Sequence, residues 1–60
     1  MYNRDVNAIA RHLTELAKSL YDEPSKWAVV MRATQAVAAG IKEKNPGFDA
    51  EGFIARVRGF

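Results

Sequence analysis

The chain has 60 residues, of which 48% are hydrophobic and 27% charged, and it contains no cysteine. These values indicate one folded domain, residues 1–60, and exclude intrinsic disorder, disulfides and thiolate metal sites. A net charge of +2, from nine Lys or Arg against seven Asp or Glu, is too small to identify a nucleic-acid-binding protein by itself.

No part of the sequence has the pattern of a membrane span or a signal peptide. The longest apolar segment, residues 27–41, is interrupted by Arg32, Thr34 and Gln35, and it falls short of the roughly 20 apolar residues that a span needs. Residues 1–5 are mostly polar and read as a natural start rather than a leader. We therefore expect a cytoplasmic protein that makes no contact with a membrane.

The first predicted helix covers about residues 4–20 and is amphipathic. Asn3 is expected to cap it, and Asp5 suits the positive end of the helix dipole. The apolar residues recur at steps of three and four, which is the spacing of one buried face: Val6, Ile9, Ala10, Leu13, Leu16, Ala17 and Leu20. This helix therefore has one face for the core and one face for water.

The second predicted helix covers about residues 24–43 and is apolar over most of its circumference. Pro24 suits its first turn, and Asp22 or Glu23 is expected to cap it. Apolar or small residues lie on almost every side: Trp27, Val29, Val30, Met31, Ala33, Ala36, Val37, Ala38, Gly40 and Ile41. A helix of this kind is normally buried on more than one side.

Several residues of the second helix are candidates for binding. Ala33, Ala36 and Gly40 allow another backbone to approach closely, either from a helix of the same chain or from a second copy of the protein. A twofold interface uses the same patch on both chains, so one such strip is enough for a homodimer. Trp27 is either a core residue or a binding hot spot. Arg32 either marks the solvent side or pairs with an acid of another chain.

The segment after the second helix predicts a turn and a third helix over residues 50–58. Pro46 ends the second helix, and Gly47 supplies backbone freedom for the reversal. Asp49 is placed to cap the new helix, and Phe48 and Phe53 have the spacing of a hydrophobic staple. The sequence therefore predicts an all-α fold, a compact three-helix domain that associates through the second helix.

No catalytic, metal or cofactor site is expected. His12 is the only imidazole, and it stands seven residues from Ser19 on the polar face of the first helix, too far for a hydrogen bond. The acids Asp22, Glu23 and Asp49 precede helix starts, where capping explains them. We expect a protein that is not an enzyme.

Basic residues near the third helix leave nucleic-acid binding as an alternative. Arg56 and Arg58 on that helix, and Lys42 and Lys44 at the end of the second, could contact phosphates. The connection over residues 44–49 is longer than that of a helix-turn-helix, and acids are interleaved with the basic residues. Protein–protein contact is therefore the favoured mode of action.

Three short segments form a pattern: Asn3-Arg4, Ile9-Ala10 and residues 45–53, which fit Asn-Pro-x-Phe-Asp-x-x-x-Phe. The pattern resembles a group of small proteins encoded by tailed phages and prophages of actinobacteria, although Gly47 and Gly52 stand where that group carries basic residues. The resemblance implies no activity. It implies a protein made in the cytoplasm of a bacterial host, where it binds a host or phage macromolecule.

Overall fold

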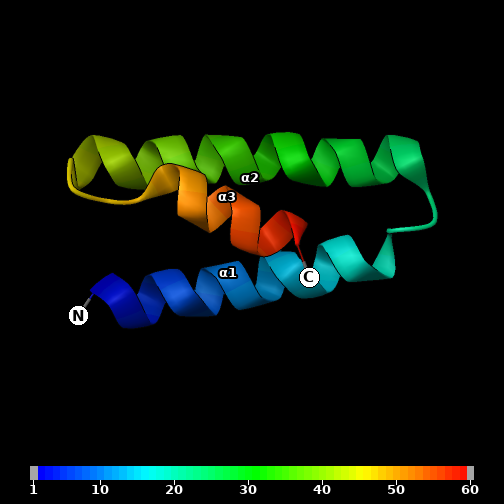
Figure 1. The fold of residues 1–60 in the computed structure, drawn as a ribbon, viewed down its shortest axis with the longest axis horizontal. Coiled ribbons are helices and arrows are strands. Elements are labelled where there is room, and N and C mark those ends of the chain that lie inside the picture. The colour runs from blue at the N-terminus through cyan, green and yellow to red at the C-terminus, as the bar shows by residue number, and fades with distance from the viewer. Residues whose placement is uncertain (1, 60) are drawn as a thin grey trace.

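A computed structural model describes the backbone of residues 2–59 and the side chains of residues 4–59. It contains three helices, α1 (Tyr2–Ser19), α2 (Pro24–Lys44) and α3 (Ala50–Arg58), and no strand within the described part of the chain (Figure 1). The predicted all-α, three-helix domain is confirmed, and each helix end lies within two residues of its predicted position.

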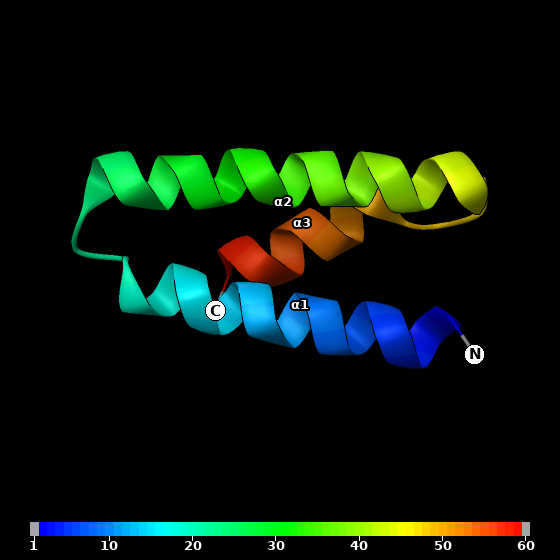
Figure 2. The same ribbon diagram turned by 180° about the vertical axis from the view of Figure 1, so that it is seen from behind.

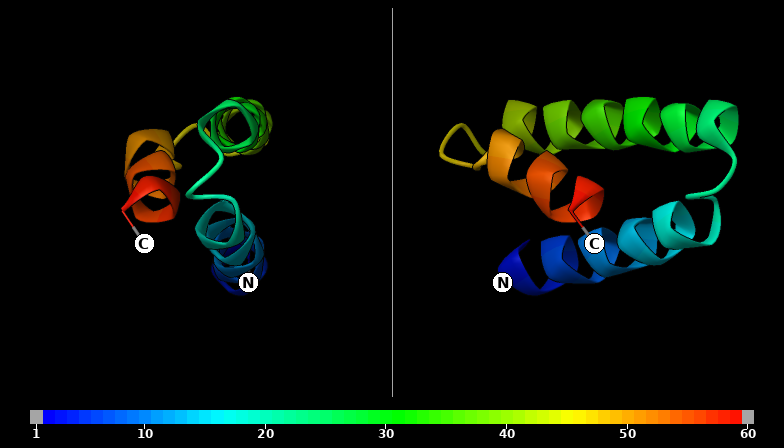
Figure 3. Two further views of the ribbon diagram at one scale, coloured as in Figure 1. Left: turned by 90° about the vertical axis from the view of Figure 1, so that its right-hand side faces the viewer. Right: turned by 45° about the vertical axis from the view of Figure 1, so that its right-hand side comes forward.

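The two long helices lie side by side and run antiparallel, so the start of α1 and the end of α2 are at the same end of the molecule (Figure 1, Figure 2). The short helix α3 crosses this pair on one side, from the end of α2 toward the middle of α1 (Figure 1). Seen end-on, the three helices form a triangle, and the outer side of the α1–α2 pair carries no further helix of the described chain (Figure 3). Helix α3 therefore covers one face of the pair and leaves the opposite face open.

The core lies where α3 meets the α1–α2 pair. Three of its eight buried hydrophobic residues are alanines, and the full set is Ala10, Ala17, Val30, Met31, Ala38, Phe48, Phe53 and Val57. The largest side chains with no exposed surface among the described residues are Val57 and Thr34. Each long helix therefore presents small residues to α3, and these let the three backbones approach one another.

Thr34 is a polar residue inside this core, although the sequence pattern marks it as an interruption of an apolar segment. Its side chain is 0% exposed, and its hydroxyl donates a hydrogen bond to the carbonyl oxygen of Val30 at 2.8 Å. Because the acceptor belongs to the preceding turn of the same helix, the buried hydroxyl is satisfied without a partner from α1 or α3.

Two of the predicted helix caps are wrong. Helix α1 begins at Tyr2, so Asn3 lies inside the helix instead of preceding it. Glu23 occupies the cap position of α2, but its carboxylate makes no capping hydrogen bond and instead pairs with Lys26 at 2.8 Å. Since Pro24 has no N–H, the start of α2 has one donor fewer to satisfy. The ammonium group of Lys26, one turn away, also competes for the carboxylate of Glu23.

The turn before α3 has the predicted cap and staple. The side chain of Asp49 accepts a hydrogen bond from the backbone N–H of Gly52 at 2.9 Å. The rings of Phe48 and Phe53 are both buried and meet edge to face, with centroids 5.6 Å apart. The prediction for Gly47 is wrong, because no glycine among the described residues has a positive φ. The reversal therefore rests on Pro46, the cap and the staple.

Gly52 has a specific place in this cap. A Cβ atom at this position would lie 2.8 Å from Cγ of Asp49 and closer still to one of its carboxylate oxygens. Such a contact is shorter than real Cβ atoms show, so the side chain of Asp49 would have to move. The absence of a side chain at Gly52 thus leaves room for the carboxylate that caps α3.

The relation between Asp49 and Gly52 can be tested with a double-mutant cycle. Asp49→Ala should lower the free energy of unfolding by about 1 kcal/mol, because the cap is lost. Gly52→Ala alone should change it little, since a helix-propensity gain of up to about 1 kcal/mol is offset by the displaced carboxylate. In the Asp49→Ala background the same change should stabilise. Urea denaturation at one protein concentration measures all four forms, and an equal gain in both backgrounds would refute the steric argument.

The role of Thr34 can be tested with two substitutions. Thr34→Val keeps the shape of the side chain and leaves the carbonyl of Val30 its helical hydrogen bond, so the free energy of unfolding should stay within about 0.5 kcal/mol. Thr34→Ser removes one buried methyl group and should cost about 1 kcal/mol. Thermal or chemical denaturation compares them. A larger cost for valine than for serine would show that the hydroxyl, and not the volume, is what the core needs.

Candidate functional site

The face of the α1–α2 pair that points away from α3 carries exposed apolar residues, and we call it the open face. Its members are Ile9 and Leu16 on α1 and Val29, Ala33, Val37 and Gly40 on α2. Ile9, Leu16 and Val29 are 39%, 47% and 65% exposed, which makes them three of the most exposed large hydrophobic residues in the described chain. Contiguous apolar surface of this kind on a small protein is typical of an interaction site.

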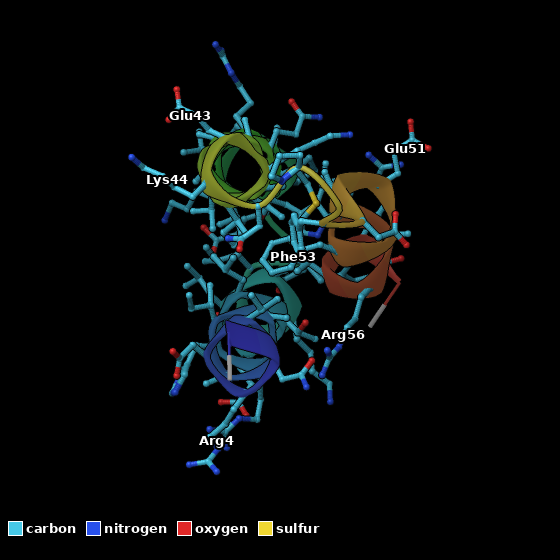
Figure 4. The ribbon with its side chains drawn as sticks, turned by 90° about the vertical axis from the view of Figure 1, so that its left-hand side faces the viewer. Arg4, Glu43, Lys44, Glu51, Phe53 and Arg56 are labelled. Carbon is cyan, nitrogen blue, oxygen red and sulfur yellow. The ribbon has the colours of Figure 1, made fainter. Side chains whose placement is uncertain are left out.

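A groove runs along the open face at the end formed by the start of α1 and the close of α2. Its volume is about 390 Å³, and its lining comes from these two helices and the residue after α2: Asp5, Val6, Ile9, Val37, Gly40, Ile41, Lys44 and Asn45. The floor is apolar. The walls differ in charge, because Asp5 stands on the α1 side and Lys44 on the α2 side, where Figure 4 shows it pointing away from α3.

The small residues of α2 do not seat another helix of the same chain. Ala33, Ala36 and Gly40 are all exposed, and a Cβ atom built at Gly40 would meet nothing within 4 Å. The first of the two roles considered for these residues, packing within the monomer, is therefore wrong. The reason is the direction of α3: Met31 and Ala38 of α2 are buried in the same core as Phe53 and Val57 of α3. The side of α2 away from α3 carries no further helix of the described chain (Figure 3).

Trp27 and Arg32 lie apart from the groove. Trp27 is partly buried and packs against the core, and its indole Nε1 is buried without a hydrogen-bond partner among the described residues. Arg32 is exposed, and it forms no ion pair with any side chain of residues 4–59. Trp27 thus closes the core near the start of α2, whereas Arg32 lies in solvent beside the exposed Ala36.

The four basic residues of the nucleic-acid alternative do not gather on one surface. Lys42 and Lys44 are two residues apart on α2, and Arg56 and Arg58 are two apart on α3, so the members of each pair point to different sides of their helix. Viewed along the bundle, Lys44 lies on the open side and Arg56 on the far side, between α3 and α1 (Figure 4). Glu43 and Glu51 also project from this end, so the charges there are mixed.

Arg56 has a structural partner. Its guanidinium Nη1 donates a hydrogen bond to Oδ1 of Asn7 at 2.7 Å, which ties α3 to α1 across the molecule. Beside this bond lies a second hollow of about 330 Å³, whose apolar part is formed by Val6, Phe48 and Phe53. Because the staple residues Phe48 and Phe53 form its floor, this hollow belongs to the packing of α3. The motif at residues 45–53 therefore has a structural role there.

Sequence reasoning missed the residues that make the open face distinctive. Ile9 and Leu16 belong to the same apolar stripe as the buried Ala10 and Ala17, and the stripe does not tell which edge α3 covers. The signal in the sequence of α1 is the difference in side-chain size: the small Ala10 and Ala17 lie where the helices come closest, and the large Ile9 and Leu16 lie beside that line. Asp5 was assigned to the helix dipole alone, although its side chain also lines the groove.

No helix in the described part of the chain is long and apolar enough to cross a membrane. His12 is exposed on α1, and no group of three acidic, histidine or cysteine side chains among the described residues could hold a metal ion. Comparisons of the chain with protein-family models, with curated proteins and with solved structures find no match. The open face is therefore interpreted from its own geometry.

Proposed function

We propose that the chain acts by protein–protein contact through the open face, as a small accessory protein of the kind that tailed phages encode. It would work in the cytoplasm of a bacterial host, where its partners are a second copy of itself and a host or phage protein. The observation that carries the proposal is an apolar groove between two antiparallel helices, which Ile9 lines, together with the exposed side chains of Leu16 and Val29 outside the groove.

The energetics of the open face support contact with another protein. Removing apolar surface from water contributes about 25 cal/mol per Å², so side chains as exposed as Leu16 and Val29 gain free energy when they are covered. A pair of helices with a groove between them also offers a seat for a further helix, which is a common mode of recognition. The core of the monomer is thin, and small helical proteins of this length are commonly stabilised by association.

Nucleic-acid binding through Lys42, Lys44, Arg56 and Arg58 has less support. These residues are divided between several sides of two helices, and Arg56 is already bonded to Asn7. A protein that tracks a phosphate backbone normally gathers its basic residues in one patch or stripe.

Site-specific photo-crosslinking in host cells tests the proposed function. A benzophenone amino acid placed at Leu16 or Val29 should give protein adducts, because both side chains lie on the open face. The control is the same amino acid at Glu15, an exposed residue of the polar side of α1 next in sequence to Leu16. Adducts of equal yield from all three positions, or from none, would contradict the proposal. The adduct mass distinguishes a second copy from another protein.

A further inference from the structure

We infer that the occupant of the open face is a second copy of this chain, related by a twofold axis that runs parallel to α1 and α2. This inference rests on the proposed function and makes it more specific. Rotation about such an axis places α1 of one copy on α2 of the other and keeps each residue at its own level along the bundle. The two helix pairs then form four long helices in which every neighbour is antiparallel, with both α3 helices on the outside.

Charge favours this arrangement. Asp5 and Lys44 line the two walls of the groove at the same end, and they form no ion pair with each other in the described chain. Because the rotation exchanges the walls and preserves the level, Asp5 of each copy faces the partner's Lys44. One patch that carries both charges is thus complementary to itself, as an isologous interface requires, and the dimer contains the pair twice.

The other twofold arrangement brings like charges together. An axis perpendicular to the helices would lay α2 on the partner's α2 in antiparallel fashion. Lys26 and Lys44 are 18 residues apart in sequence, about five full turns, so they lie on the same side of α2 near its two ends. In that arrangement each Lys44 would face the partner's Lys26, which is already paired with Glu23, so Lys44 would gain no partner of opposite charge there.

Side-chain sizes also fit the axis parallel to the helices. Starting from Asp5 opposite Lys44, four residues along α1 lead to Ile9, and four residues back along α2 lead to Gly40. Eleven residues in the same directions lead to Leu16 and Ala33. Each exposed large residue of α1 therefore faces a small residue of the partner's α2. Gly40 has no atom within 4 Å of a Cβ position, so the groove has room there for the partner's Ile9.

The open face is large enough for a specific dimer. A helix of 18 residues is roughly 27 Å long, and two helices of about 10 Å diameter give a footprint of roughly 500 Å² per copy. The total of roughly 1,000 Å² reaches the lower limit for a specific interface. Its apolar part includes Ile9, Leu16 and Val29, which are among the exposed large hydrophobic residues of the described chain.

The first test blocks the seat for Ile9. Gly40→Leu should abolish the dimer at concentrations at which the unmodified chain is dimeric, because the new side chain fills the groove where the partner's Ile9 would enter. The helix itself tolerates the change, since the position is open in the monomer. Ala39→Leu, one residue away on an exposed position outside the groove, is the matched control and should leave association unchanged. Sedimentation equilibrium measures association, and circular dichroism verifies that both variants are folded.

The second test exchanges the charges. Asp5→Lys or Lys44→Asp alone should weaken association about tenfold at low salt, and the double variant should restore it, because the pair is re-formed with opposite sign. Asp5 and Lys44 also interact favourably with the dipoles of their own helices, so exchanging their charges could affect folding as well as association. Glu51→Lys and Lys18→Asp reverse charges in the same helix positions away from the open face and serve as controls for this effect. The controls should leave the dissociation constant unchanged.

The outcomes separate this inference from the proposed function. An unmodified chain that stays monomeric at millimolar concentration overturns the inference, as does a dimer that is insensitive to Gly40→Leu or is not restored by the double charge exchange. Crosslinks from Leu16 and Val29 to another protein would then still support contact through the open face. Loss of those crosslinks together with a monomeric chain would overturn both.

Discussion

The constraint on which this structure depends is the shortness of α3. Within the part of the chain that the structure describes, the nine residues of α3 and the buried Phe48 before them cover one face of a pair of helices with 18 and 21 residues. The core forms along that contact, where Ala10, Ala17 and Ala38 let the backbones approach and Val57 fills the space between them. The thin core and the open face both follow from the small number of residues in α3.

The position of α3 is determined by local interactions at its start and one bond along its length. Asp49 caps the first turn, Phe48 and Phe53 lock the entry of the chain against the core, and Arg56 bonds to Asn7 on α1. Together they direct α3 across one side of the α1–α2 pair (Figure 4). The segment with the most distinctive sequence, residues 45–53, therefore acts indirectly, since it decides which face of the long helices remains uncovered.

Much of the fold could be predicted from the sequence, because periodicity, Pro24, Pro46 and the cap at Asp49 are local signals. Burial was harder to predict. The apolar stripe of α1 contains both Ala10 and Ile9, and only the side on which α3 packs decides that one is buried and the other 39% exposed. The exposure of Gly40 depends on the same choice. That the side chain of Glu23 makes no capping hydrogen bond could not be predicted, since its ion pair with Lys26 competes for the same carboxylate.

The proposed twofold arrangement would unite these observations, because it would give the exposed large residues of α1, the small residues of α2 and the charges of the groove a common partner. The most direct measurement is an isotope-filtered NOE experiment on a mixture of ¹³C-labelled and unlabelled chains, which detects only contacts between copies. The account predicts cross-peaks between the Ile9 methyl groups and the Gly40 α-protons of the other copy. A dimer whose intermolecular contacts join α2 to α2, or a chain that shows no intermolecular contact at millimolar concentration, would contradict it.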